Sequence, residues 1–168
     1  RDIPDFPKPG ILFKDITPIL SDPGLFGKSI RLFADRHRNG GIDKVAGVES
    51  RGFLFAAALA LELGVGIVPI RKKGKLPGKT ISEEYTLEYG EAIVEIHDDA
   101  IQAGEKVLVV DDLLATGGTA EAGIKLIERL GGEIVSTSFI VDLPDLGGRA
   151  KLEAMGLEVN ALCTYAGG

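Results

Sequence analysis

Two adjacent carboxylates and a stretch rich in glycine and threonine form the segment best equipped for chemistry. The segment reads Val109-Val110-Asp111-Asp112-Leu113-Leu114-Ala115-Thr116-Gly117-Gly118-Thr119. Asp111 and Asp112 follow four apolar residues and accept hydrogen bonds, which suits hydroxyl groups such as those of a ribose. Gly117 and Gly118 allow backbone N–H groups to close on an anion, and a helix starting here favours phosphate. A ligand site at a strand end is therefore favoured over an ordinary junction with capping aspartates.

A second candidate feature is a cluster of positive charge between residues 71 and 79. Its members are Arg71, Lys72, Lys73, Lys75 and Lys79, with no acidic residue among them. The whole chain has 19 Lys and Arg against 25 Asp and Glu, a formal net charge of −6. A local cluster on an acidic protein suits a compact anion such as pyrophosphate, because the remaining surface repels a long polyanion. Charge pattern alone leaves open the alternative of a solvated lysine-rich loop.

Two familiar motifs are incomplete in this chain. Gly74 lies one residue too close to Gly78-Lys79-Thr80 for a nucleotide-binding P-loop, and no helix pattern follows. Val48 stands where the nucleophile motif Gly-x-Ser-x-Gly needs a glycine before Ser50. Neither a P-loop nor an acyl-transfer triad is therefore expected.

Composition limits the remaining classes. The 168 residues, 45% apolar and 26% charged, predict one globular domain spanning residues 1–168. The acidic balance argues against nucleic-acid binding, and the apolar runs are too short to span a membrane. The chain opens without a secretory leader, and its single cysteine, Cys163, fits a reducing compartment, so we expect a cytoplasmic protein. His37 and His97 are expected on the surface, and Cys163 in the core.

Strand and helix patterns alternate along the chain, which predicts an α/β domain with an open, mostly parallel sheet flanked by helices. Expected strands cover residues 44–48, 66–70, 107–110, 134–141 and 157–162, and expected helices cover 25–38, 53–63 and 120–130. Pro69 indicates a sheet edge or a strand end. Residues 84–96 are typical of a hairpin that turns at Gly90. Prolines in residues 1–20 disfavour a helix there and predict an extended arm.

The segment 109–119 resembles the signature with which type I phosphoribosyltransferases bind phosphoribosyl pyrophosphate (PRPP). Residues 6–18, 49–53, 71–78 and 85–90 narrow the resemblance to the adenine-specific members, in family order and across nearly the whole chain. Many relatives have Asp where Glu49 stands. The resemblance implies the family fold, with residues 1–20 as a base-binding arm or hood and residues 72–96 as a flexible lid and hairpin.

The same resemblance implies the reaction of adenine with PRPP to give AMP and pyrophosphate, and hence a role in purine salvage. Mg²⁺ is the implied cofactor and is carried mainly by PRPP, with no dedicated protein ligands. The implied partners are these small molecules and a second copy of the chain in a homodimer.

The resemblance also assigns site residues. The residues implied to bind the ribose and the 5′-phosphate are Asp111, Asp112, Ala115, Thr116, Gly117, Gly118 and Thr119. The residues implied to bind pyrophosphate are Glu49, Ser50, Arg51, Gly52, Arg71, Lys72 and Lys75. The resemblance also implies a cis peptide bond near Glu49-Ser50. Adenine is implied to bind to backbone groups of Leu12, Phe13 and Lys14, with the base lying between Phe13 and Leu143.

Glu88 and Arg51 are the implied catalytic residues. A carboxylate at Glu88 takes up a purine proton or stabilises the cationic sugar, and the sequence leaves both roles open. The alternative for Glu88 is an exposed hairpin glutamate. Arg51 belongs to the implied pyrophosphate loop, and Lys75 and Arg71 add positive charge as the leaving pyrophosphate gains negative charge.

Two competing functions remain to be weighed. A xanthine or orotate phosphoribosyltransferase shares the PRPP signature, but the proline-rich arm and residues 87–90 favour adenine. A PRPP-sensing transcriptional regulator needs an added DNA-binding module, which the charge of −6 and the use of nearly all 168 residues disfavour.

Overall fold

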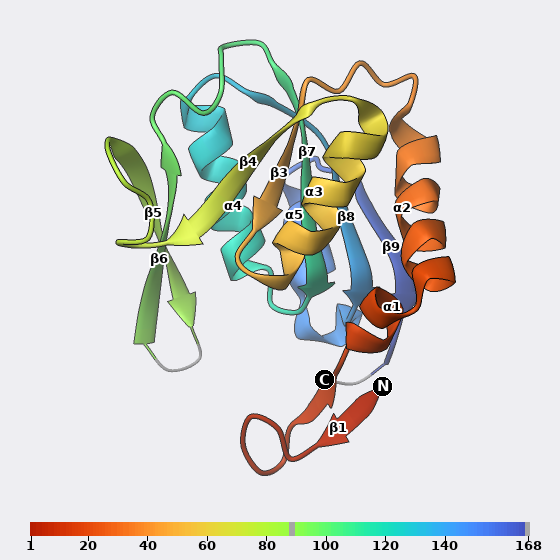
Figure 1. Ribbon diagram of the computed structural model, residues 1–168. Helices are drawn as coiled ribbons and strands as arrows, with labels where there is room; N and C mark the ends of the chain where they lie inside the picture. The colour runs from red at the N-terminus through yellow and green to blue at the C-terminus, as the bar shows by residue number, and fades with distance from the viewer. Residues whose placement is uncertain (88–89, 167–168) are drawn as a thin grey trace.

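A seven-stranded sheet forms the centre of the protein in the computed structural model, which describes residues 1–87 and 90–166 (Figure 1). The strand order is β5-β6-β4-β3-β7-β8-β9. The strands are β3 (Lys44–Val48), β4 (Gly66–Lys72), β5 (Thr80–Leu87), β6 (Gly90–His97), β7 (Lys106–Leu114), β8 (Glu133–Asp142) and β9 (Val159–Thr164). The pairs β4–β3, β3–β7, β7–β8 and β8–β9 are parallel, so the predicted sheet type is confirmed.

Helices cover both faces of this sheet (Figure 1). They are α2 (Pro23–His37) and α3 (Arg51–Leu63) on one face, and α4 (Gly118–Arg129) and α5 (Gly148–Ala154) on the other. Successive side chains of a strand point to opposite faces. Val107 and Val109 of β7 therefore pack under α4, whereas Leu108 and Val110 pack under α2 and α3. Burial on both faces explains why the centre of β7 is a continuous apolar run.

The strands β5 and β6 form the predicted hairpin at one edge of the sheet, antiparallel over their whole length. Strand β4 pairs with β6 only at Arg71 and Lys72, so within the described residues the stretch around Pro69 has a partner on one side alone. A proline is tolerated at such a position. The expectation of a sheet edge or strand end was nevertheless wrong for the sheet as a whole, because β4 is an interior strand and Pro69 lies within it.

The N-terminal arm contains the short antiparallel strands β1 (Asp2–Pro4) and β2 (Leu12–Lys14), followed by helix α1 (Thr17–Ser21). The expectation that residues 1–20 contain no helix was wrong for its last residues. Pro18 lies in the first turn of α1, where its missing N–H would have had no partner in any case. The arm lies beyond the carboxyl ends of β7 and β8 (Figure 1).

Other differences concern single elements. Helix α5 and the 3-10 turn η1 (Pro144–Leu146) were not predicted. His37 is buried rather than on the surface, because it lies one turn after Phe33 on the core side of α2. Within residues 1–87 and 90–166, no helix combines the length and the apolarity needed to cross a bilayer.

Candidate active site

Asp111 and Asp112 lie within β7, not after it. The strand was expected to end at residue 110, but its pairing with β8 continues to Leu114, opposite Asp142. Parallel pairing with a long neighbour therefore carries both carboxylates to the carboxyl edge of the sheet, where ligands of such folds bind. The Asp112 side chain is buried and the Asp111 side chain is half-buried.

Arg51, at the start of α3, binds one of these carboxylates. Its Nε donates to Asp112 Oδ2 at 2.5 Å, and the Asp112 backbone N–H donates to Asp111 Oδ1 at 2.8 Å. Burial, together with the neighbouring charge of Asp112, raises the pKa of Asp111 well above its usual range. The two adjacent acids thus have different surroundings: Asp112 is paired with Arg51, whereas burial beside Asp112 disfavours the charged form of Asp111.

The loop after β7 encloses a small pocket of about 100 Å³. It is lined by Asp111, Leu113, Leu114, Ala115, Thr116, Gly117, Gly118, Thr119 and Ala120. Gly117 is the residue before α4 and has a φ of 84°, a left-handed value that favours glycine. The pocket is of a size to hold a phosphate. The N–H groups of the first turn of this 12-residue helix and the hydroxyls of Thr116 and Thr119 are hydrogen-bond donors that suit such an anion.

A larger adjoining pocket of about 330 Å³ joins segments that are far apart in sequence. Its lining is Val48, Glu49, Ser50, Arg51, Lys72, Tyr85, Asp111, Asp112, Leu113 and Thr119. The carboxyl ends of the parallel strands β3, β4 and β7 bring these residues together. Sequence reasoning missed Tyr85 as a lining residue, although its alternation with Leu87 and Tyr89 marked it as one side of a strand. Hairpin pairing alone does not reveal which element that side faces.

Glu49 lines this pocket and contacts basic residues at and beside it. Its Oε1 accepts from Arg71 Nε at 3.0 Å and from the Lys72 N–H at 3.1 Å, while Lys75 Nζ lies 3.7 Å from Oε2. Burial alone would raise the pKa of Glu49, but the bonds from Lys72 and Arg71 and the charge of Lys75 lower it. The peptide bond Glu49-Ser50 is cis, as expected from the resemblance. Glu49 therefore holds cations in place and remains charged.

The arm reaches the same region through Phe13. The Arg51 guanidinium lies 5.5 Å from the Phe13 ring centroid, and Phe6 packs edge-on against that ring at 5.1 Å. Leu143 is buried beside the core under α2 and α3, and its N–H donates to Leu114 O at 3.0 Å. Phe13 thus lies beside the carboxylate pocket, and Leu143 is tied to the strand that carries the carboxylates.

The other two arm residues differ from Phe13 in their surroundings. Leu12 is exposed, and Lys14 pairs with Asp2 at 2.7 Å while its Nζ lies 4.5 Å from the centroid of the Tyr165 ring. These contacts occupy the Lys14 side chain, in line with the expectation that its identity says little about the choice of base.

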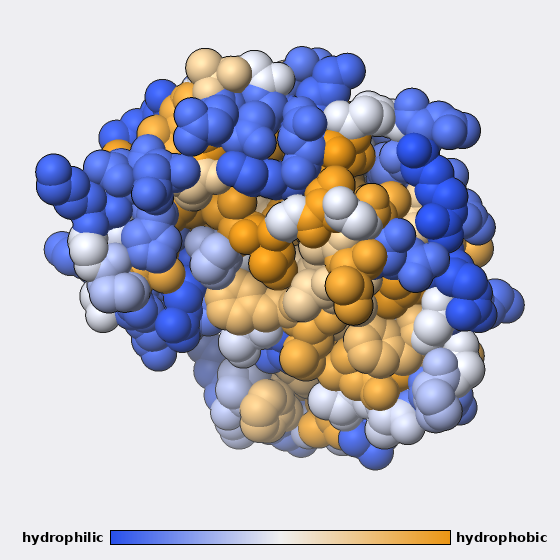
Figure 2. Space-filling model, turned by 45° about the horizontal axis from the view of Figure 1, so that its top comes forward, coloured by the Kyte–Doolittle hydropathy of each residue, from blue (hydrophilic) through white to orange (hydrophobic). Residues whose placement is uncertain are grey.

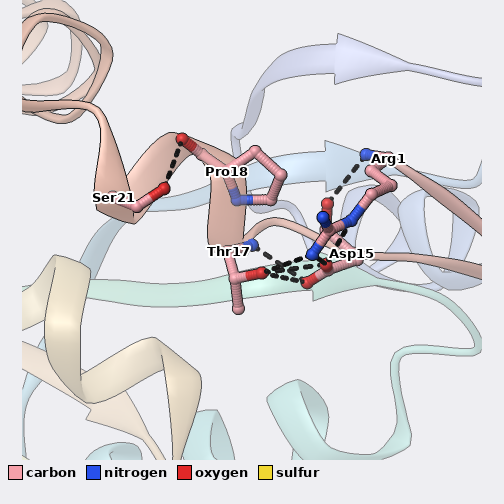
Figure 3. A network of polar contacts seen from close by, with 5 residues as sticks. All are labelled: Arg1, Asp15, Thr17, Pro18 and Ser21. Carbon is pink, nitrogen blue, oxygen red and sulfur yellow. Dashed lines mark hydrogen bonds and ion pairs between the residues drawn. The ribbon is translucent and has the colours of Figure 1, made fainter.

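Asp15 fixes the turn between β2 and α1 (Figure 3). The backbone N–H of Thr17 donates to Asp15 Oδ1 at 3.0 Å, and the Arg1 side chain donates to Oδ2 at 2.6 Å. These bonds lower the pKa of Asp15 to about 2. Asp15 follows the predicted base-binding residues directly, and its charge also acts on Arg51. It was not among the predicted site residues.

Glu88, the predicted acid of the hairpin, lies outside the described residues. The pairing of β5 with β6 runs from Thr80 and His97 to Leu87 and Gly90.

A mostly parallel sheet carries a carboxylate pair beside a phosphate-sized pocket at a helix start. The family model described as "Phosphoribosyl transferase domain" matches residues 15–153, so the fold is that of a phosphoribosyltransferase. The adenine phosphoribosyltransferase of Roseobacter denitrificans is 71% identical over 167 residues, covering 99% of this chain and 95% of the relative. The chain therefore belongs to the adenine phosphoribosyltransferase family, as the resemblance predicted.

Solved structures of adenine phosphoribosyltransferases have the same fold as this chain. The adenine phosphoribosyltransferase of Thermoanaerobacter pseudethanolicus is 52% identical with a TM-score of 0.93, covering 98% of this chain and 95% of that one. The enzyme of Saccharomyces cerevisiae is 45% identical with a TM-score of 0.91, covering 96% and 93%. The yeast structure is a complex with D-2,5-dideoxy-2,5-imino-altritol 1,6-bisphosphate and adenine.

Proposed function

We propose that this protein transfers the 5-phosphoribosyl group of PRPP to adenine, releasing pyrophosphate and forming AMP for purine salvage. The observation that carries this proposal is the single pocket in which Asp111 and Asp112 meet Arg51 and Lys72. The phosphate-sized loop adjoins it and shares Asp111 and Thr119. PRPP needs these three surfaces: hydroxyl acceptors for its ribose, a phosphate cradle and cations for its pyrophosphate.

The residues divide between these surfaces. Asp111 and Asp112 receive the ribose hydroxyls, and residues 115–119 receive the 5′-phosphate. Pyrophosphate binds at residues 49–52 and Lys72. Arg71 and Lys75, whose side chains are paired with Glu49, add positive charge beside it. Adenine binds to the backbone of residues 12–14 and lies between Phe13 and Leu143. Residues 1–20 are thus the base-binding arm, and residues 72–96 the lid and hairpin, of a single domain spanning residues 1–168.

The reaction breaks the bond between the ribose C1 and a pyrophosphate oxygen and forms a bond from C1 to an adenine ring nitrogen. By analogy with other glycosyl transfers, positive charge develops on the sugar as the leaving group departs. Arg51 and Lys72 line the pocket where the leaving group gains negative charge, so they stabilise it most when the bond is breaking. Glu88 accepts the proton that adenine loses or stabilises the sugar cation.

Mg²⁺ enters with PRPP, whose oxygens supply most of its ligands. The residues that fit it are Asp111 and Asp112, since carboxylate oxygens are the donors that Mg²⁺ prefers. In the described ranges, no group of three or more His, Cys, Asp and Glu side chains is arranged to hold a metal. When bound, the ion neutralises part of the pyrophosphate charge.

We also propose that the protein works in the cytoplasm as a homodimer joined through the face of α2 and α3. Figure 2 shows a hydrophobic area bordered by hydrophilic side chains on the molecule. Leu25, Leu32, Leu54 and Leu61 of these two helices are exposed, Leu61 by 84%. A groove of about 490 Å³ lies between the helices. Apolar surface of this kind is typical of a subunit interface.

A panel of bases tests the proposed activity. Pyrophosphate release is measured with PRPP and, separately, adenine, hypoxanthine, guanine, xanthine or orotate. The proposal expects release with adenine far above that with any other base. Equal or greater release with another base would replace adenine as the substrate, and no release with any base would reject the enzyme.

A further inference from the structure

We propose that Arg149 is a positioning residue: it touches no substrate, but it fixes the 5′-phosphate loop by holding α5 against that loop. The inference rests on the proposed function, in that residues 115–119 are taken as the site of the 5′-phosphate. It adds a residue from an element that sequence patterns did not reveal.

The first residue of α5 is in direct backbone contact with the loop. The Gly148 N–H donates to Ala115 O at 2.9 Å. A Cβ placed on Gly148 would lie 2.5 Å from that oxygen and 3.0 Å from the Gly117 nitrogen. A Cβ on Gly117 would lie 3.0 Å from the Gly148 Cα. Because two backbones meet here without intervening side chains, a shift of α5 moves the loop directly.

An ion pair fixes α5 in this place. Arg149 Nε donates to Asp142 Oδ2 at 2.6 Å, and its Nη1 donates to Val159 O at 3.2 Å. Asp142 is the last residue of β8 and lies in register with Leu114, the residue before the loop. The pair therefore connects α5 to the ends of the two strands that flank the phosphate site, and to β9.

Water cannot easily take the place of Arg149 at the Asp142 carboxylate. The Asp142 side chain is fully buried, whereas that of Arg149 is 31% exposed. Within the described residues, Asp142 Oδ1 has no hydrogen-bond partner. The ion pair with Arg149 is therefore what offsets the cost of burying the Asp142 charge. Removing the partner of a buried charge is strongly unfavourable, so the arginine holds one position.

A purely structural role predicts a different outcome from a positioning role. If Arg149 only stabilised the fold, its loss would lower the melting temperature and weaken all ligands alike. If it positions the loop, its loss weakens the ligands that carry a 5′-phosphate and spares free pyrophosphate, which binds on the other side of the pocket.

The test compares Arg149→Gln, Arg149→Lys and Gly148→Ala with the wild type. Glu153→Gln is the matched control, because it removes the charge of the exposed partner of Arg149, 3.1 Å from Nη1, and leaves Asp142 paired. Dissociation constants for AMP and for Mg²⁺-pyrophosphate are measured by calorimetry, with KM for PRPP, kcat and the melting temperature of each variant.

We expect Arg149→Gln to weaken AMP binding by about tenfold to 100-fold and to raise KM for PRPP, with pyrophosphate affinity unchanged. Arg149→Lys should recover part of the loss, Gly148→Ala should reproduce it sterically, and Glu153→Gln should match the wild type. Equal weakening of AMP and pyrophosphate, or normal AMP binding in folded Arg149 variants, overturns the inference. A wild-type protein that binds neither AMP nor PRPP would instead reject the proposed function.

Discussion

The Arg51 guanidinium joins the pocket to the N-terminal arm: its Nε donates to Asp112 Oδ2 at 2.5 Å, and its Cζ lies 5.5 Å from the Phe13 ring centroid. A residue proposed to bind pyrophosphate thus contacts both a carboxylate proposed for the ribose and the arm proposed for the base. If these roles hold, PRPP competes with Asp112 for Arg51 when it binds, and one side chain couples the three proposed substrate regions.

Replacement of Asp112 tests this coupling. Asp112→Asn keeps the shape but loses the charge that Arg51 neutralises, and it places an amide donor where ribose hydroxyls need an acceptor. We expect PRPP affinity to fall by about tenfold to 100-fold, the range for a hydrogen bond to a charged group. Direct binding of PRPP by calorimetry is the measurement, and far-ultraviolet circular dichroism checks that the fold is retained. Unchanged affinity and kinetics would remove Asp112 from the ribose site.

Asp111 should make stability depend on pH. Burial and the charge of Asp112 raise its pKa in the folded protein above the unfolded value. The folded protein then keeps a proton that the unfolded chain has lost, so stability falls as pH rises from the ordinary aspartate pKa through the raised one. Asp111→Asn removes this loss and still accepts the Asp112 N–H.

We therefore expect Asp111→Asn to gain stability relative to the wild type as pH rises, while PRPP use falls. Urea unfolding of both proteins from about pH 4 to about pH 8 measures the difference. A stability difference that is the same at every pH would contradict the raised pKa.

The proposed lid should become ordered when PRPP binds. The Gly74 N–H and the Thr80 hydroxyl both donate to Glu95, and Arg129 donates to Ser82 O at 2.7 Å. These bonds hold the base of the hairpin, and His97 at Pro77 O and the Asp98 N–H at Lys79 O hold residues 77–79. We expect PRPP to add contacts at Lys72 and Lys75, which the proposal places at the pyrophosphate. Hydrogen exchange followed with and without PRPP should show increased protection within residues 72–86. Equal protection in both states would contradict a lid.

Glu88 should act in the chemical step. Glu88→Gln keeps the size of the side chain but loses its charge, so we expect the single-turnover rate to fall by about 10²- to 10⁴-fold while PRPP affinity stays normal. Glu88→Asp should recover only part of the rate, because its carboxylate is displaced by one methylene. A normal single-turnover rate in Glu88→Gln would leave Glu88 as a hairpin residue without a catalytic role.

Leu61 should report on the proposed dimer. It is exposed by 84% on α3, so Leu61→Lys costs the monomer little but places a charge in an apolar interface. We expect the wild type to have the mass of a dimer in light scattering and the variant to shift toward the monomer. The control Leu146→Lys changes a leucine exposed by 40% in η1, far from α2 and α3 in sequence. Identical masses for all three proteins would rule out this face.

Much of the fold follows from local patterns, because each central strand carries its own apolar signal. The meeting of residues 49–52, 71–75 and 111–119 was also predictable, since parallel strands end at one edge of the sheet. Helix α5 was not, because a seven-residue helix that starts at Gly148 has too few apolar positions to show a period. Its role depends on a backbone contact with Ala115, a long-range relation that no local pattern contains.

His37 shows a signal that was present but not used. It follows Phe33 by four residues and so shares the buried side of α2. Tyr85 shows the opposite case. Alternation placed it on one side of a strand, but only the packing of β5 against α4, with the Tyr85 ring 3.2 Å from a Cβ built on Gly118, brings it into the pocket.

A crystal structure of the protein with AMP and Mg²⁺-pyrophosphate would show the proposed substrate positions together. We expect the 5′-phosphate on the backbone N–H groups of residues 115–119 and the ribose hydroxyls on Asp111 and Asp112. We expect pyrophosphate beside Arg51 and Lys72, and adenine between Phe13 and Leu143. AMP bound with its phosphate away from the start of α4, or with its ribose away from the two carboxylates, would reject the proposed site.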